Sequence, residues 1–367
     1  MITDGIEQII ITDHSILGGL RQEWNELVAS RLGNLYMTFE WVTSLWESHL
    51  GMRDTEFVIL KAASQLQGIF PLTRQVVRKM HMPFCQYGLV TNNYGQNHND
   101  LILFHHQSAC MDSLLNYLRE KRWDIFFVGS VPSDSKTILL LRELEGYYNY
   151  RLIKEPYVSS PFLTLNGTWE TFIERKSGNF RSDLQRKWNK TKHNRTEFKI
   201  YSQPGDVDHI LEEICKIESN SWKEDSKTSI TTQPIAKKFY NIFLPKAAEN
   251  GWLYVVIFYI DGKPAAYDMG ILFANKYYML KTSYDLEFKQ WSPGTILRQF
   301  VIQELYKMNV GEHDFLGSDD AYKMRWTDTV RKHWNIYLYN KNRPVSAFYS
   351  FIREHRGRIR GWPDNKS

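Results

Sequence analysis

A short stretch in the last third of the chain holds residues that could bind an anion. Residues 283–297 read SYDLEFKQWSPGTIL, so Ser292, Pro293, Gly294 and Thr295 stand where an amphipathic helix is expected to begin. A helix N-terminus carries unpaired N–H groups and a partial positive charge, a glycine lets a ligand approach the backbone, and a proline suits the first helical position. The same four residues would also make an ordinary capped turn, so this stretch alone leaves both interpretations open.

A second stretch follows with further reactive side chains. Residues 313–326, HDFLGSDDAYKMRW, place Asp314, Tyr322, Lys323 and Arg325 just beyond an expected strand end. Ligands of α/β sheets bind outside the carboxyl ends of strands. A tyrosine hydroxyl there can give a proton to a leaving group, while a lysine and an arginine can hold phosphates. This second stretch strengthens the interpretation of the first as an anion site.

Apolar periodicity predicts the elements that position these residues. In the second half it predicts strands over 197–201, 277–283 and 313–316, helices over 169–190, 207–222, 234–250 and 295–308, and a strand pair near 334–339. The dipeptide Asp261-Gly262 between two apolar runs predicts a hairpin of 252–260 with 265–272.

The first half repeats this pattern without repeating the letters. Helices are predicted over 17–30, 40–50, 111–121 and 137–145, a hairpin over 56–62 and 67–77, and a buried strand over 124–128, before the chain crosses over near 158–164. Two copies of one α/β unit are therefore expected.

Composition narrows the class of protein. A chain of 367 residues is long enough for two domains, and a net charge of 46 − 41 = +5 does not by itself imply nucleic acid. Cys85, Cys110 and Cys215 lie far apart and form no CxxC pair, which indicates reduced thiols in a cytosolic protein without a zinc knuckle. We expect no signal peptide in residues 1–15 and no membrane-spanning helix, because the start lacks a basic segment and no apolar run approaches 18 residues.

Two polar segments could form further sites. Residues 175–195 hold eight lysines or arginines, one acid (Asp183) and Trp188, which suits either RNA, a nucleotide-sugar or anionic lipid, or a solvated helix face. Residues 94–100, YGQNHND, carry His98 and Asp100, but their spacing does not demand a metal and a polar loop is expected.

Four motifs in order resemble one family. SYDLEFKQWSPGTIL and the following HDFLGSDDAYKMRW, together with the upstream IESNSWK (217–223) and NFRSDLQRKWNK (179–190), resemble the CelD-like (BioF2-like) acyltransferases of the GNAT superfamily. The resemblance covers 169–334, while the first half matches only in pattern. It implies a tandem GNAT fold related to the Fem aminoacyltransferases, with two mixed, mostly antiparallel sheets flanked by helices.

The resemblance also implies an activity and its residues. GNAT enzymes transfer an acyl group from coenzyme A to an amine, and the cofactor's pyrophosphate rests on a helix entrance that corresponds here to Ser292, Pro293, Gly294, Thr295, Ile296 and Leu297, with Lys323 nearby. The usual Arg/Gln-x-x-Gly-x-Gly/Ala pattern is not met, because only one glycine is present. Tyr322 falls where the family places the tyrosine that protonates the departing thiolate.

The remaining roles are hypotheses with alternatives. Asp285, Asp314 and Glu218 are candidates for the base that takes the amine proton, with Asp285 preferred and a turn-capping role equally consistent with it. Trp222, Lys223, Tyr284 and Glu218 are expected at the acceptor, although Trp222 and Lys223 could simply end an amphipathic helix.

These observations combine into one expectation. Residues 1–160 and 161–345 would form two GNAT-like domains, followed by a basic tail over 346–367. The protein would be a cytoplasmic N-acyltransferase that uses acetyl-CoA or another acyl-CoA without a metal, on a small-molecule amine such as an amino sugar or amino-acid derivative of envelope or polysaccharide synthesis. The alternatives are a Fem-like transferase that uses aminoacyl-tRNA, the one case with a nucleic-acid partner, and a non-catalytic GNAT-fold module.

Overall fold

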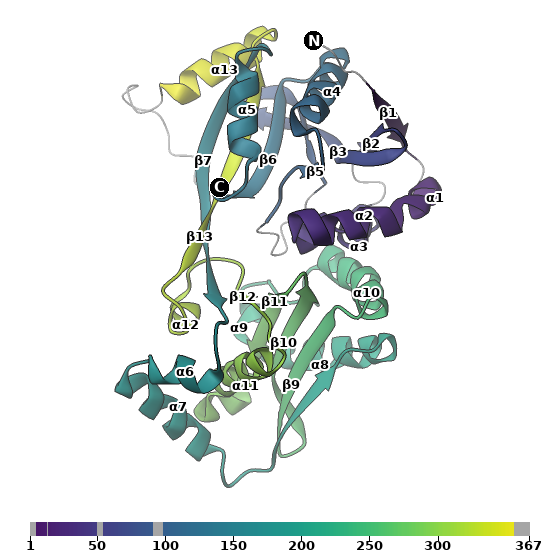
Figure 1. Ribbon diagram of the computed structural model, residues 1–367. Helices are drawn as coiled ribbons and strands as arrows, with labels where there is room; N and C mark the ends of the chain where they lie inside the picture. The colour runs from purple at the N-terminus through teal and green to yellow at the C-terminus, as the bar shows by residue number, and fades with distance from the viewer. Residues whose placement is uncertain (1–4, 13, 50–53, 91–97, 356–367) are drawn as a thin grey trace.

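The computed structural model describes residues 5–12, 14–49, 54–90 and 98–355 (Figure 1). Across these residues the strands form one 13-stranded sheet, with β5 paired to β3 beside the path β1-β2-β3-β4-β6-β13-β7-β12-β11-β10-β9-β8. The two halves of this path have the same pattern: the strands are mostly antiparallel, and each half contains one parallel pair, β4 with β6 and β11 with β12. The predicted α/β class with two mostly antiparallel units in tandem is confirmed.

The first half has helices on both faces of its sheet. Its strands are β1 (Ile6–Ile11), β2 (Asp54–Ala62), β3 (Gln65–Lys79), β4 (Met82–Leu89), β5 (Ile102–Leu103) and β6 (Ile125–Pro132). Its α-helices are α1 (His14–Leu17), α2 (Arg21–Leu27), α3 (Phe39–Ser48), α4 (Gln107–Glu120) and α5 (Thr137–Glu145). Successive residues of β2 alternate between faces, so Ile59 packs in the core with α2 and α3 while Val58 packs in the core with α4 and α5.

The second half repeats the arrangement. Its strands are β8 (Thr196–Tyr201), β9 (Leu253–Ile260), β10 (Lys263–Phe273), β11 (Lys276–Tyr284) and β12 (Glu312–Asp314). Its α-helices are α6 (Trp169–Glu174), α7 (Gly178–Lys190), α8 (Val207–Ser219), α9 (Trp222–Asp225), α10 (Pro234–Glu249), α11 (Pro293–Lys307) and α12 (Ala321–Met324). Ile257 of β9 packs in the core with α8 and α10, and Phe258 packs in the core with α11.

Two long strands connect the halves. β7 (Tyr150–Thr164) and β13 (Val330–Asn340) run side by side between them (Figure 1). β13 pairs with β6 on its other edge, so the end of the chain returns to the first half, where α13 (Pro344–Glu354) packs Tyr349 against Phe84. A division at 160/161 would fall inside β7, and it remains a proposal.

An apolar interface also joins the halves. Trp41 of α3 makes edge contacts with Phe239 and Phe243 of α10, each with ring centroids 4.9 Å apart. A shared hydrophobic core of this kind resists relative movement of the two halves. In the ranges that the structure describes, no helix is both long enough and apolar enough to cross a bilayer.

Several predicted elements differ from those observed. The helix predicted over 169–190 is two helices, because Ser177 caps α7 by accepting the Phe180 N–H. Ser221 starts α9 in the same way, so the helix predicted over 207–222 stops early. The strand pair near 334–339 is the single strand β13, and the expected tail begins as α13, while 356–367 lies outside the described residues.

Gly270 provides a test of the sheet that carries the site. A Cβ there would lie 2.0 Å from the Tyr277 ring, whereas a Cβ at Gly178 would meet nothing within 4 Å. We expect Gly270→Ala to lower the free energy of unfolding by roughly 2–3 kcal/mol, as overpacking does. The control Gly178→Ala should change it by less than about 0.5 kcal/mol. Urea unfolding measures both, and equal stabilities would contradict this packing.

Candidate active site

The sheet opens beside β11, because β12 stops pairing with it partway along. The parallel ladder ends at the pair Tyr278 and Asp314, while β11 continues to Tyr284. The chain then turns through Leu316, which has a φ of 51° and donates its N–H to Asp314 Oδ1 at 2.9 Å. Within the described residues, the outer part of β11 therefore has no strand partner on that side, and such an edge can pair with an extended ligand.

The turn before α11 is built around Ser292. Its backbone is left-handed (φ 56°, ψ 47°), which is uncommon for a non-glycine residue and recurs at functional sites. Its carbonyl accepts the N–H of Thr295 at 3.0 Å and of Ile296 at 3.3 Å. Pro293 has no N–H, so Gly294 is the residue of this first turn whose N–H lacks a backbone acceptor in the described part of the chain. The helix entrance thus offers fewer free donors than a bare helix end.

A pocket of about 490 Å³ lies between the end of β11, the start of α11 and α12. It brings together seven predicted site residues, Trp222, Tyr284, Ser292, Pro293, Gly294, Thr295 and Tyr322. Segments that are a hundred residues apart in the sequence thus meet at one pocket.

The lining of this pocket is cationic. It includes Lys289, Arg298 and Arg325, and no carboxylate is among the described residues that line it. Arg298 is buried in an ion pair with Asp268, and Arg325 lies 2.6 Å from Asp183, while Lys289 forms no ion pair in the described ranges. Guanidinium and ammonium groups at a helix entrance favour phosphate groups, so these side chains supplement the few backbone donors.

Tyr322 lies in the pocket with its ring partly in solvent. Its exposed fraction is 48%, yet the surroundings of its hydroxyl exclude enough water to raise its pKa to about 12, and the nearby Arg298 only partly opposes this. The hydroxyl therefore stays protonated at neutral pH. It can donate a hydrogen bond or a proton to a thiolate, the form that a thiol of ordinary pKa near 8.5 takes when it leaves.

Two of the predicted acceptor residues, Glu218 and Lys223, lie in a buried cluster, and Lys223 Nζ is 5.9 Å from the centre of the Trp222 ring. Glu218 accepts from Lys223 Nζ at 3.1 Å and from the Tyr267 hydroxyl at 2.5 Å, and Lys281 Nζ lies 3.4 Å away. Burial alone would raise the pKa of Glu218, but Lys223 and Lys281 outweigh it and lower the pKa. Burial, with Lys281 beside it, lowers the pKa of Lys223 to about 8.

This cluster bears on the proposed base. The Glu218 carboxylate is fully buried and paired with cations, so it is a weak base and lies away from the pocket lining. The sequence could not reveal this, because Tyr267 and Lys281 lie on strands far along the chain.

Asp314 joins the two halves and does not line this pocket. Its Oδ2 lies 2.8 Å from His98 Nε2 and accepts from Arg331 at 3.0 Å. Burial alone would raise the pKa of Asp314, but His98, then Arg331 and the Leu316 N–H, outweigh it and lower the pKa to about 2. His98 and Asp100 lie at the end of the loop predicted over 94–100, whose residues up to 97 lie outside the described residues.

The other predicted residues have structural partners. Asp285 caps the 3-10 helix Leu286–Trp291 and accepts from Asn220 at 2.5 Å. Lys323 donates to the carbonyls of Leu316 and Ser318 at 2.8 and 2.9 Å. Ile296 faces a different pocket, described below, and Leu297 is in the core. None of these side chains lines the pocket in the described ranges, so their catalytic or binding roles remain predictions.

Sequence reasoning missed Lys289, Arg298 and Thr282. Arg298 stands four residues after Gly294, hence one turn further along α11, and this spacing could have revealed it. Its pairing with Asp268 of β10 could not be read from the sequence.

The low pKa of Asp314 predicts an acid-dependent loss of stability. A carboxyl whose folded pKa is about 2 stabilises the protein above its unfolded pKa near 4, and this contribution disappears as the pH falls from about 4 to 2. We expect Asp314→Asn to lower the free energy of unfolding at pH 6 by roughly 2–3 kcal/mol. The difference from wild type should shrink toward pH 2.

Urea unfolding at pH 6, 4 and 3 measures this dependence. Asp54→Asn is a suitable control, because Asp54 is exposed and lies 3.4 Å from Arg74, and it should cost less than about 1 kcal/mol. A pH-independent difference for Asp314→Asn would contradict the assignment.

Comparisons with known proteins bear on the fold and on this region. Residues 178–324 match the family model of the acetyltransferase (GNAT) domain. FemX superposes with a TM-score of 0.62 and 12% identity, over 93% of this chain and 99% of its own. The comparison with curated proteins found no match.

Two further solved structures share the architecture. A conserved protein of unknown function from Bacteroides thetaiotaomicron has a TM-score of 0.57 and 11% identity, over 87% of this chain and 97% of its own. The C-terminal domain (DUF2156) of a putative lysylphosphatidylglycerol synthetase from Agrobacterium fabrum has a TM-score of 0.53 and 11% identity, over 94% of this chain and 99% of its own. Residues 178–324 are therefore similar to an acetyltransferase (GNAT) domain, and the chain as a whole shares the fold of FemX.

Proposed function

We propose that this protein is an N-acyltransferase that moves an acyl group from coenzyme A to an amine acceptor. The observation that carries the proposal is the opening between β11 and β12, with the cationic entrance of α11 at one end and Tyr322 beside it. A GNAT domain generally uses acyl-CoA, which supports the choice of donor.

Each part of an acyl-CoA has a matching feature. The pyrophosphate would contact the Gly294 N–H, the hydroxyl of Thr295 and the cations Lys289 and Arg325. The two amides of the pantetheine arm would pair with the free edge of β11 as an added strand. The thioester would then lie in the opening, where a β11 N–H can polarise its carbonyl.

In the proposed acyl transfer, Tyr322 is the one side chain that exchanges a proton with the reactants. The neutral amine attacks the thioester carbonyl, the C–N bond forms, the C–S bond breaks, and the leaving thiolate takes a proton from the Tyr322 hydroxyl. Because no described residue lining the pocket is a carboxylate, we propose that the amine enters neutral, that its nitrogen gives its surplus proton to water after the attack, and that Tyr322 regains a proton from solvent. Asp285 and Asp314, predicted as bases, would then hold the surrounding loops.

The acceptor would approach from the side of Trp222. This half-exposed indole lines the pocket, and Nζ of the buried Lys223 lies 5.9 Å from the centre of its ring. A CelD-like or BioF2-like enzyme acting in the cytoplasm on an amino sugar or amino-acid derivative, in envelope or polysaccharide synthesis, is consistent with this arrangement. An aminoacyl-tRNA donor and a non-catalytic module are the alternatives that the binding test separates.

Gly294 gives the direct test of cofactor binding. Its φ is not left-handed, and an added Cβ would lie 3.4 Å from Tyr284 Cδ1, so alanine fits there. An aspartate would add a negative charge at the helix entrance, where phosphate binding needs a positive one. We expect Gly294→Asp to weaken binding of acetyl-CoA, octanoyl-CoA and free CoA by more than about tenfold, and Gly294→Ala to weaken it much less.

Calorimetric titration of folded wild type and both variants measures this. Failure of every CoA species to bind the folded wild-type protein would contradict the proposal. Titration with aminoacyl-tRNA would then test the Fem-like alternative, with salt dependence as its signature.

Tyr322→Phe tests the leaving-group step. Removal of the hydroxyl should lower kcat by about 10- to 1000-fold, because the thiolate loses its proton donor, and should leave the affinity for acyl-CoA nearly unchanged. Release of free thiol from acetyl-CoA, with amino sugars and amino acids as acceptors, measures the rate. Tyr147→Phe, at an exposed position of the first half, should retain wild-type turnover. An unchanged kcat in Tyr322→Phe would remove this residue from the mechanism.

A further inference from the structure

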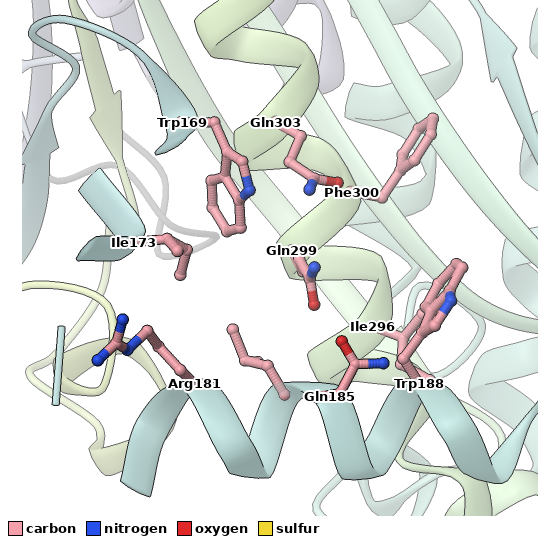
Figure 2. Close-up of a pocket in the computed structure, with 10 residues that line it drawn as sticks. Trp169, Ile173, Arg181, Gln185, Trp188, Ile296, Gln299, Phe300 and Gln303 are labelled. Atoms are coloured by element: carbon pink, nitrogen blue, oxygen red, sulfur yellow. The ribbon is translucent and has the colours of Figure 1, made fainter. Parts of the chain in front are cut away.

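A second groove lies between α6, α7 and α11 (Figure 2). It has a volume of about 420 Å³ and is lined at helical spacing, by Trp169 and Ile173 of α6, by Arg181, Gln185 and Trp188 of α7, and by Gln299, Phe300 and Gln303 of α11. Because each helix presents residues that are three or four positions apart, the three helices turn matching faces to one hollow. This size suits a single nucleotide or a short organic ligand.

The groove is separate from the acyl-CoA pocket. Ile296, Gln299 and Gln303 of α11 line the groove, whereas Gly294 and Arg298 line the other pocket. Phe300 also lines the groove, and it stands two positions after Arg298. Residues two positions apart point to different sides of a helix, so the two hollows lie on different faces of α11. The helix α11 therefore stands between the two hollows.

Aromatic rings give the groove flat, rigid surfaces. Trp188 is 38% exposed, and its ring lies parallel to Phe198 at a centroid distance of 6.2 Å. Phe198 in turn stacks on Phe300 at 4.1 Å, so the rings form an ordered column. An exposed indole fixed by such a column offers a stacking surface to a planar ligand at little cost in side-chain entropy.

The polar groups of the groove are glutamine amides, the Arg181 guanidinium and the indole N–H groups of Trp169 and Trp188. The amide groups of Gln299 and Gln303 make no hydrogen bond within the described ranges, and each can both donate and accept. No carboxylate is among the described residues that line the groove. A ligand rich in hydroxyl donors would be matched poorly by such a lining, because carboxylates are the strong acceptors for hydroxyl groups. A ligand rich in acceptors, such as a nucleobase, would be matched well.

The electrostatic surroundings favour an anion. Arg181 forms no ion pair with any residue in the described part of the chain and lines the groove. On the same helix the one acid, Asp183, already contacts Arg186 at 2.5 Å and Lys187 at 2.9 Å, so its charge is more than balanced. The Lys187 and Arg186 contacts lower the pKa of Asp183 despite its partial burial. The potential along α7 is therefore positive.

We propose that this groove binds a nucleotide, with the base stacked on Trp188, its edge bonded to the glutamine amides and a phosphate at Arg181. The same chemistry is offered by a free nucleotide, by the nucleotide part of a nucleotide-sugar and by a nucleotide of single-stranded RNA. This inference does not depend on acyl-CoA as the donor.

Calorimetric titration of the full chain tests it with three probes: UMP, UDP-N-acetylglucosamine and the ribotrinucleotide UUU. At least one should bind with a Kd below about 1 mM, and the tightest of them identifies the source. Trp188→Ala should weaken that binding by about 5- to 150-fold, the effect of losing one base stack. Arg181→Gln should weaken it as well, while Arg186→Gln, a matched change on the same helix outside the groove, should not.

Two further outcomes are informative. Gly294→Asp should retain nucleotide binding, and Arg181→Gln should retain acetyl-CoA binding, which keeps the two sites distinguishable. The proposal is overturned if none of the three probes binds folded protein, if Trp188→Ala and Arg181→Gln bind as wild type does, or if Gly294→Asp abolishes UMP binding. Arg181 is exposed, so its variant should fold even if Trp188→Ala does not.

Discussion

The buried carboxylate of Asp314 is the constraint on which the site depends. It accepts the Leu316 N–H, which ends β12 and turns the chain away from β11. It also pairs with Arg331 of β13 and with His98 of the first half. One side chain thus opens the sheet and holds the two halves together at the same point. A carboxylate with three such partners is costly to bury unless all of them are present, so the opening is fixed rather than adjustable.

Around this opening the charges are unevenly distributed. Two buried acids of the second half pair with cations, Glu218 with Lys223 and Asp268 with Arg298, and the described residues that line the pocket at the start of α11 are cationic or neutral. Asp268 and Asp183 hold the Arg298 and Arg325 side chains of this pocket in place before a ligand arrives. A preorganised cationic site binds an anion without reorganising, which is the electrostatic condition for both binding and catalysis.

Local sequence patterns predicted the features that depend on neighbouring residues. The Asp261-Gly262 turn, the entrance of α11 and Tyr322 all follow from neighbouring residues, and the structure brings Gly294 and Tyr322 into one pocket. The paired state of Asp314 could not be predicted, because its partners lie on strands and loops far along the chain. The same holds for the return of β13 to the first half: periodicity identifies a strand but not its neighbours.

The position of β13 also sets the order in which the protein can be completed during synthesis. β6 and β7 are made early, yet the strand between them consists of residues 330–340, so the first half lacks a central strand until the second half has been made. Contacts of such long sequence separation form slowly. The first half therefore depends on β13 for its native state, and a ribosome-bound chain that stops before it exposes the facing edges of β6 and β7, where aggregation can begin.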